Sequence, residues 1–246
     1  MLRFARQRSR IIGALATPVV FWLLLGSGLN RAFSAVEGAG RPIGYLEYFF
    51  PGTIVMIVLF TAVFTTFSVI EDRKAGFMQG VLAVPVPRLA IVLGKILAGA
   101  CIATIQGTLL LAIWPLIGGV FEPLALVKSM AVLFVLGVSL TGLGLCMAWP
   151  MDSIQGFHAL MNLVLMPMWF LSGAVFPPTT APLWLQIVIY ANPLTYGQSI
   201  LRQAMGTEPM TGVSPPLAAA VTALFAVVTI ALATIVVTRR RKDGRP

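Results

Sequence analysis

The chain has 246 residues, of which 58% are hydrophobic and only 10% are charged, and its formal net charge is +9. A water-soluble domain carries about 25% charged residues, so this composition excludes an ordinary soluble fold. The long apolar runs do not alternate with polar residues, which excludes the strands of a membrane barrel. We therefore predict an all-α integral membrane protein that forms a single domain over residues 1–246.

Six apolar segments have about the length needed to cross a bilayer, which is about 20 residues. The predicted spans cover residues 11–29, 49–70, 89–117, 129–148, 156–176 and 217–237. The first segment follows four arginines and could be taken for a secretion signal. Its apolar stretch is too long for a typical signal and no small-residue cleavage site follows it, so we expect an uncleaved first span.

The connection between the second and third spans, residues 71–95, is the most informative stretch of the chain. Four charged residues open it, and apolar residues then follow at helical spacing from Phe77 to Leu82. Two prolines end the pattern, because proline lacks a backbone donor and restricts the residue before it. We predict a short amphipathic helix at the cytoplasmic face. An ordinary interfacial helix and a docking element for a soluble partner both fit this pattern.

Two stripes of side chains follow one face of a predicted span. The stripe of the second span is Phe60, Phe64 and Phe67, and that of the fifth span is Asn162, Met166 and Trp169. Aromatic and methionine side chains adapt to varied apolar ligands, so the stripes fit either helix packing or a substrate pathway. Gln106 in the third span fits a hydrogen bond between helices better than a substrate contact.

A shorter apolar run of about ten residues lies between Pro182 and Pro193, after the fifth span. Runs of this length form interfacial or re-entrant elements rather than spans, so we predict a short re-entrant helix on the outer side. Residues 193–215 are predicted to form an outer connection that contains Arg202.

Lys and Arg gather at both termini and between the second and third spans, as is typical of cytoplasmic flanks. Six spans return the C-terminus to the side of the N-terminus, so we predict a multi-pass protein with both termini in the cytoplasm. The basic residues do not indicate nucleic-acid binding, because no soluble domain exists to carry it.

Residues for catalysis are missing from the sequence. A phosphate-binding loop requires Ser or Thr after Gly-Lys, whereas Ile96 follows Gly94 and Lys95. His158 is the only histidine, and we predict no metal site. It fits an interfacial histidine better than a proton relay, and Asp152 fits a solvated turn. Paired intramembrane carboxylates, which proton-coupled transport uses, are absent from the sequence.

Two blocks of sequence resemble the permeases of ABC-2-type transporters, most closely the branch of drug- and antibiotic-resistance exporters. The blocks are EDRKAGFMQGVLAVPVPRLAIVLGK, at 71–95, and MPMWFLSGAVFPPTTAPLWLQIVIYANPLTYGQSILR, at 166–202. The resemblance implies that the first block is a coupling helix that docks on an ATPase. The coupling residues are then Glu71, Asp72, Arg73, Lys74, Gly76, Phe77, Gly80, Leu82, Pro85 and Arg88.

The resemblance also implies a function. The chain would be the permease subunit of an exporter that moves an amphipathic or lipid-like substrate (a drug, antibiotic, lipid or glycan) out of the cytoplasm. A separate ATP-binding-cassette subunit would bind ATP and magnesium, so this chain would be no enzyme and would bind no cofactor. A second permease copy would complete a homodimer in the bacterial cytoplasmic (inner) membrane, with the two stripes around a central cavity.

Two alternatives remain open at this point. A membrane assembly or immunity protein that does not transport could share the same bundle. A membrane-embedded lipid-modifying enzyme would require clustered acidic or histidine residues at a membrane face, and the sequence lacks them.

Overall fold

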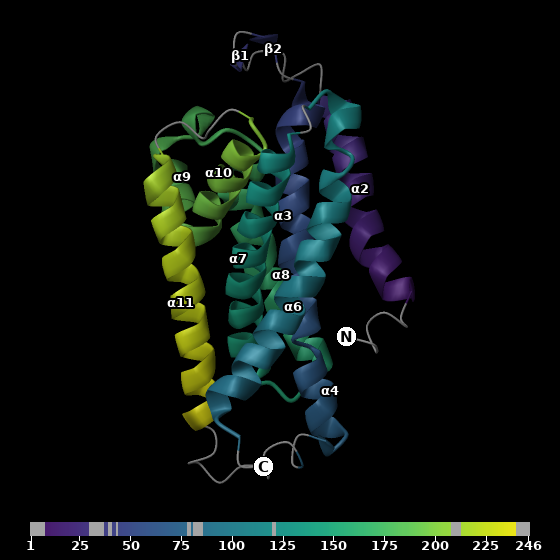
Figure 1. Ribbon diagram of the computed structural model, residues 1–246, viewed down its shortest axis with the longest axis vertical. Helices are drawn as coiled ribbons and strands as arrows, with labels where there is room; N and C mark the ends of the chain where they lie inside the picture. The colour runs from purple at the N-terminus through teal and green to yellow at the C-terminus, as the bar shows by residue number, and fades with distance from the viewer. Residues whose placement is uncertain are drawn as a thin grey trace.

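The computed structural model describes residues 8–29, 37–38, 41–42, 44–77, 80, 86–119, 122–207 and 213–239. Long helices stand side by side as a bundle, and short helices lie at both of its ends (Figure 1). The long helices are α2 (Arg8–Leu29), α3 (Tyr45–Thr65), α6 (Arg88–Leu111), α7 (Pro123–Ala148), α8 (Ile154–Trp169) and α11 (Pro215–Arg239). The shorter elements are β1 (Glu37–Gly38), β2 (Arg41–Pro42), α4 (Ser68–Lys74), η1 (Trp114–Ile117), η2 (Phe170–Ala174), η3 (Pro178–Thr180), α9 (Leu183–Ala191) and α10 (Pro193–Ala204).

We name the two ends of the bundle after the short helices α4 and α10, which lie at opposite ends in Figure 1. The lower end in that view, the α4 end, also carries the end of α11 and the start of α6. The upper end, the α10 end, carries α9 and the antiparallel pair β1–β2. Apart from this two-residue pair, the regular elements of the described residues are helical, as the composition predicts.

Five of the six predicted spans are confirmed as apolar helices long enough to cross a bilayer. With the short elements that continue them, they cover Tyr45–Lys74, Arg88–Ile117, Pro123–Ala148, Ile154–Ala174 and Pro215–Arg239. Helix α2 covers the predicted first span, and within the fully described part of this helix the apolar segment Pro18–Leu29 is shorter than a span. The protein is therefore a multi-pass membrane protein, and the sixth crossing stays a prediction.

Helix α3 is the central helix of the bundle. In its most apolar stretch 78% of the residues are buried, against 22% in α8 with η2 and 28% in α11. Helices α2, α6 and α7 pack around it. Because α4 follows α3 after a turn of two residues, the α4 end is connected directly to the core.

Small residues and buried hydroxyls let the central helices approach closely, as is common in membrane bundles. Gly99 of α6 lies against Thr65 of α3 and Thr141 of α7, and a Cβ at this position would clash with both side chains. On the same side of α6, Gln106 accepts a hydrogen bond from the hydroxyl of Thr61. The predicted interhelical bond of Gln106 is therefore confirmed.

The fifth span breaks before it reaches the α10 end. Its last turn is the π-helical η2, where Gly173 has a φ of +77° that glycine adopts without strain. Pro167 lies inside α8 just before the break. The Asn192 side chain stabilises the break, because its Nδ2 donates to the carbonyls of Met168 and Leu171 at 2.6 and 2.9 Å.

The predicted outer connection from residue 193 onwards contains a helix that was not expected, and its place on the outer side stays a prediction. Residues Pro193–Ala204 form α10, which begins with Asn192 as its N-cap and packs against α7, α11 and α3. The predicted short helix between Pro182 and Pro193 is present as α9. Two short helices therefore replace the one expected, and whether α9 re-enters the membrane stays a prediction. Sequence hydropathy missed α10 because its buried face carries polar residues, including Gln198 and Arg202.

Candidate coupling and transport sites

Arg73 lies on the last turn of α4 and reaches the turn that joins α7 to α8. Its Nη1 lies 3.0 Å from Oδ1 of Asp152 and also donates a 3.2 Å hydrogen bond to the carbonyl of Met151. Its Nη2 donates a 2.6 Å hydrogen bond to the carbonyl of Trp149, and the guanidinium carbon lies 5.5 Å from the centroid of that indole. A planar guanidinium can bind several acceptors at once, so Arg73 fastens α4 to the turn between α7 and α8.

Asp72 makes a second contact from the same turn, in the direction of α6. Its Oδ2 lies 2.8 Å from Nζ of Lys95, which also donates a 3.2 Å hydrogen bond to the hydroxyl of Ser68. The side chains of Asp72 and Lys95 are only 17% and 29% exposed, so the pair is shielded from water more than an ordinary surface pair. The sequence places Lys95 at the start of a span, and the structure shows that Asp72 and Ser68 bind its ammonium group there.

The charged residues that were expected to open a separate helix instead extend the second span to Lys74. The helix ends at the turn Ala75–Gly76, where Gly76 has a φ of +72°. Arg88 begins α6 and is half-buried, while the predicted coupling residues Leu82 and Pro85 lie outside the described residues. The remaining coupling residues are exposed, namely Glu71, Lys74, Gly76, Phe77 and Gly80.

The phenylalanine stripe of the second span faces α8. The ring centroids of Phe64 and Phe67 lie 5.6 and 5.4 Å from that of His158, and Phe60 lies 6.1 Å from Phe64. The structure thus brings the stripe together with the single histidine. Phe60 and Phe64 are half-buried, whereas Phe67 is buried, so the stripe is partly core.

The predicted stripe of the fifth span divides into two parts. Asn162 and Met166 are exposed on α8, next to the exposed Leu163. Trp169 is instead fully buried, and its Nε1 donates a 2.9 Å hydrogen bond to the carbonyl of Gly52 in α3. Trp169 therefore holds α8 against the core, and only Asn162 and Met166 present an open face.

Comparison with known proteins identifies the family. The family model described as "ABC-2 type transporter" matches residues 1–205, which is most of the chain. The chain belongs to this family. This match confirms the resemblance to ABC-2 permeases that the two sequence blocks indicated.

Relatives of this ABC-2 permease come from several bacteria. It is 28% identical to "Nodulation protein J" of Rhizobium leguminosarum bv. viciae over 94% of this chain and 87% of the relative. It is 26% identical to "Daunorubicin resistance ABC transporter permease protein DrrB1" of Streptomyces coeruleorubidus over 94% of this chain and 82% of the relative. It is 30% identical to "Probable multidrug ABC transporter permease YbhR" of Escherichia coli K12, over 65% of this chain and 44% of the relative.

Arg202 is a buried residue of the ABC-2 permease that the sequence analysis misplaced in a loop. Its Nη2 donates a 2.9 Å hydrogen bond to the carbonyl of Tyr48, and its guanidinium carbon lies 4.1 Å from the centroid of that ring. Burial lowers the pKa of the guanidinium, and the electrostatic interaction with Tyr48 opposes this effect. The signal in the sequence was Asn192 followed by Pro193, a helix start. The contact ties α10 to the start of α3.

Proposed function

We propose that this ABC-2 permease is the membrane subunit of an ATP-driven exporter. A separate ATP-binding-cassette subunit would bind ATP and magnesium and would dock on the α4 end, where Glu71, Lys74 and Phe77 are exposed. The anchoring of α4 by Arg73 carries the proposal, because it gives an exposed segment a firm connection to other helices. The coupling residues inferred from the sequence then divide into residues that contact the partner and residues that hold the segment.

Three connections would transmit a movement of the anchored segment to the rest of the bundle. Helix α4 continues α3 after a turn of two residues, Asp72 binds Lys95 of α6, and Arg73 binds the turn before α8. Pressure on residues 71–77 from a partner would therefore reach the central helix and both neighbouring helices together. Such coordinated movement is what a switch between inward-facing and outward-facing states requires.

The substrate is proposed to be amphipathic or lipid-like and to move along α8. Asn162 and Met166 offer an exposed amide and thioether on one face of α8, and Phe60 and Phe64 are half-buried on α3, where Phe64 contacts His158 of α8. A membrane helix with an exposed amide fits a protein or substrate contact better than a lipid contact. Two relatives whose names include multidrug transport and daunorubicin resistance support this class of substrate.

A second copy of the chain is proposed to cover the open face of α8, which forms the least buried of the five spans. The homodimer would place the two α8 faces opposite each other across a central cavity. We propose the bacterial cytoplasmic membrane as its location, with the α4 end and both termini in the cytoplasm. The basic residues at the α4 end, including Arg73, Lys74 and Arg88, support this orientation.

The test uses the full-length permease, co-expressed with a candidate ATP-binding-cassette ATPase and reconstituted in vesicles. We expect Phe77→Asp to reduce both co-purification of the ATPase and ATP-dependent efflux of daunorubicin by about tenfold or more, because a docking contact at an interface centre is often worth at least about 1.4 kcal/mol. The matched control is Lys128→Ala, an exposed residue of α7 near the α10 end. Wild-type co-purification and efflux with Phe77→Asp would overturn the docking site.

A further inference from the structure

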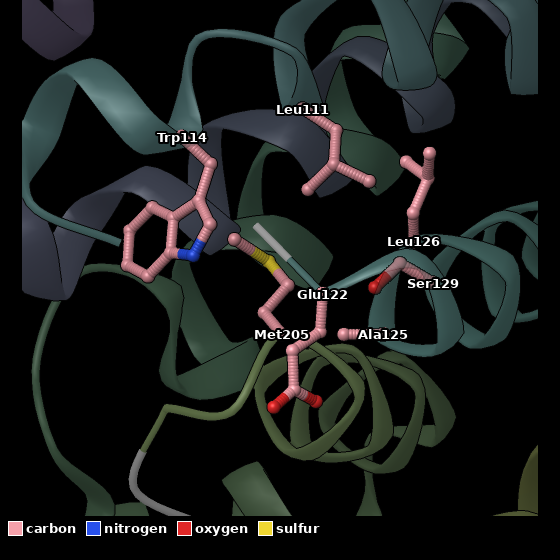
Figure 2. Close-up of a pocket in the computed structure, with 7 residues that line it drawn as sticks. All are labelled: Leu111, Trp114, Glu122, Ala125, Leu126, Ser129 and Met205. Carbon is pink, nitrogen blue, oxygen red and sulfur yellow. The ribbon is translucent and has the colours of Figure 1, made fainter. Parts of the chain in front are cut away.

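A small pocket lies at the α10 end of the bundle, between η1, the start of α7 and the end of α10 (Figure 2). Its volume is about 20 Å³, which is enough for one or two water-sized groups. It is lined by Leu111, Trp114, Glu122, Ala125, Leu126, Ser129 and Met205. The pocket lies far from the coupling residues of α4, and neither predicted stripe contributes to it.

Two polar atoms that line this pocket have no partner. Trp114 and Ser129 are only 5% and 1% exposed. Among the described residues, neither Nε1 of Trp114 nor Oγ of Ser129 finds a hydrogen-bond partner. Figure 2 shows the indole nitrogen on the side of the ring toward Met205. Buried polar groups in proteins are almost always hydrogen-bonded, so both atoms indicate a ligand in the pocket.

The indole is held in a fixed orientation. Its ring stacks on Phe50 of α3, with 5.5 Å between the centroids and 15° between the planes. Gly119 also lies against the indole, because a Cβ at this position would overlap the ring. These two contacts restrict the rotation of the Trp114 side chain. The N–H group must be satisfied inside the pocket.

Other buried polar atoms without a partner lie toward the same end of the bundle. In the part of the chain that the structure describes, every buried side-chain atom without a partner belongs to Thr108, Trp114, Ser129, Gln198 or Arg202. These residues lie in the second half of α6, in η1, in the first third of α7 and in α10. Gln198 and Arg202 share one face of α10 with Met205, which lines the pocket. Unsatisfied polarity is therefore concentrated toward the α10 end.

We infer that this pocket binds a single hydroxyl oxygen. The oxygen accepts a hydrogen bond from Nε1 of Trp114 and exchanges one with the hydroxyl of Ser129, while the exposed Glu122 lies at the rim of the pocket. A cation does not fit, because the indole N–H presents its positive end, and the carboxylate disfavours an anion. The oxygen belongs either to a water or to the alcohol group of an amphipathic molecule. This inference does not depend on the proposed function.

The experiment observes the indole N–H of Trp114 directly, by nuclear magnetic resonance of the full-length permease with ¹⁵N-labelled tryptophan. The protein is placed in nanodiscs of dioleoyl phosphatidylcholine, whose headgroup has no hydroxyl, so that water and an added probe are the only sources. Comparison with Trp114→Phe, which keeps a ring on Phe50, assigns the signal. The probe is 1-hexanol, and 1-fluorohexane is its match without a hydroxyl.

We expect a cross-peak between this N–H and water before any alcohol is added if water is the ligand. If the alcohol is the ligand, 1-hexanol should shift the signal to saturation while 1-fluorohexane does not. Either result supports the site. Ser129→Ala should weaken the observed contact about five- to tenfold, as expected for one lost hydrogen bond. Thr108→Val, which removes a hydroxyl outside the pocket, should leave it unchanged. The absence of both the water contact and the hexanol-specific shift would overturn the inference.

Discussion

Arg73 and Asp152 are 79 positions apart in the sequence, and the structure places Nη1 of the arginine 3.0 Å from the aspartate carboxylate. Only 18% of the Arg73 side chain is exposed, whereas 72% of the Asp152 side chain is. The carboxylate is therefore well hydrated, and the shielded contacts of Arg73 are those with the carbonyls of Trp149 and Met151. We therefore expect the two residues of this ion pair to contribute unequally to the stability of the fold.

We expect Arg73→Ala to lower the free energy of unfolding by about 1–3 kcal/mol, because it removes two hydrogen bonds to part-buried carbonyls. Asp152→Asn should lower it by less than about 1 kcal/mol, because an exposed ion pair is weak. Denaturant unfolding of the purified permease in detergent would measure both. Equal losses for the two variants would contradict the assignment of the main contact to the carbonyls.

The pair of Asp72 and Lys95 should show a measurable coupling between α4 and α6. In a double-mutant cycle with alanine at both positions, we expect a coupling energy of about 0.5–1 kcal/mol. The exchanged pair, Asp72→Lys with Lys95→Asp, should recover part of the stability lost in either single exchange. Lys74→Ala, on the exposed side of the same turn, is the control and should change the unfolding midpoint little. Strict additivity would show that the charges do not interact.

Two glycines of α6 allow a matched test of close helix packing. Gly99→Ala should destabilise the protein by about 1–3 kcal/mol, because the added methyl group overpacks the contact with Thr65 and Thr141. Gly94→Ala on the same helix meets no atom within 4 Å and should be neutral or slightly stabilising, since alanine favours helix. Thermal unfolding of both variants would provide the comparison. A destabilisation of the same size at both positions would point to the helix backbone rather than to packing.

The hydrogen bond between Thr61 and Gln106 should contribute modestly to the joining of α3 and α6. We expect Gln106→Leu to destabilise the bundle by about 0.6 kcal/mol and by no more than about 1.7 kcal/mol, the range found for such bonds in membranes. Unfolding in mixed detergent micelles would measure the change. Thr104→Val is the control, because that hydroxyl bonds to the carbonyl of Ala100 in its own helix. A larger loss for the control would contradict the interhelical role.

Sequence patterns could predict the elements that depend mainly on residues close together in the sequence. Five spans appear close to the predicted positions, because a bilayer requires a long apolar segment and such segments are visible in any window of sequence. Gln106 also behaves as predicted, because an amide inside an apolar helix must find a partner on a neighbouring helix.

Features that depend on distant parts of the chain could not be predicted. Arg73 was recognised as part of a charged segment, but the carbonyls that it binds belong to a turn 76 and 78 positions away. By its spacing, Trp169 shares a helical face with Met166. Its indole is nevertheless buried next to the break in the helix, where it donates a hydrogen bond to the carbonyl of Gly52. Helix α10 was missed because its polar face is covered by other helices rather than by water.

The side-chain amide of Asn192 has a mechanical consequence. Its nitrogen holds the two carbonyls that the break after α8 exposes, while its oxygen accepts a 3.0 Å hydrogen bond from the backbone of Leu194 and so starts α10. One side chain therefore links two helices by hydrogen bonds. Any tilt of the end of α8 must move α10 as well, and with it the hydrogen bond between Arg202 and the first turn of α3.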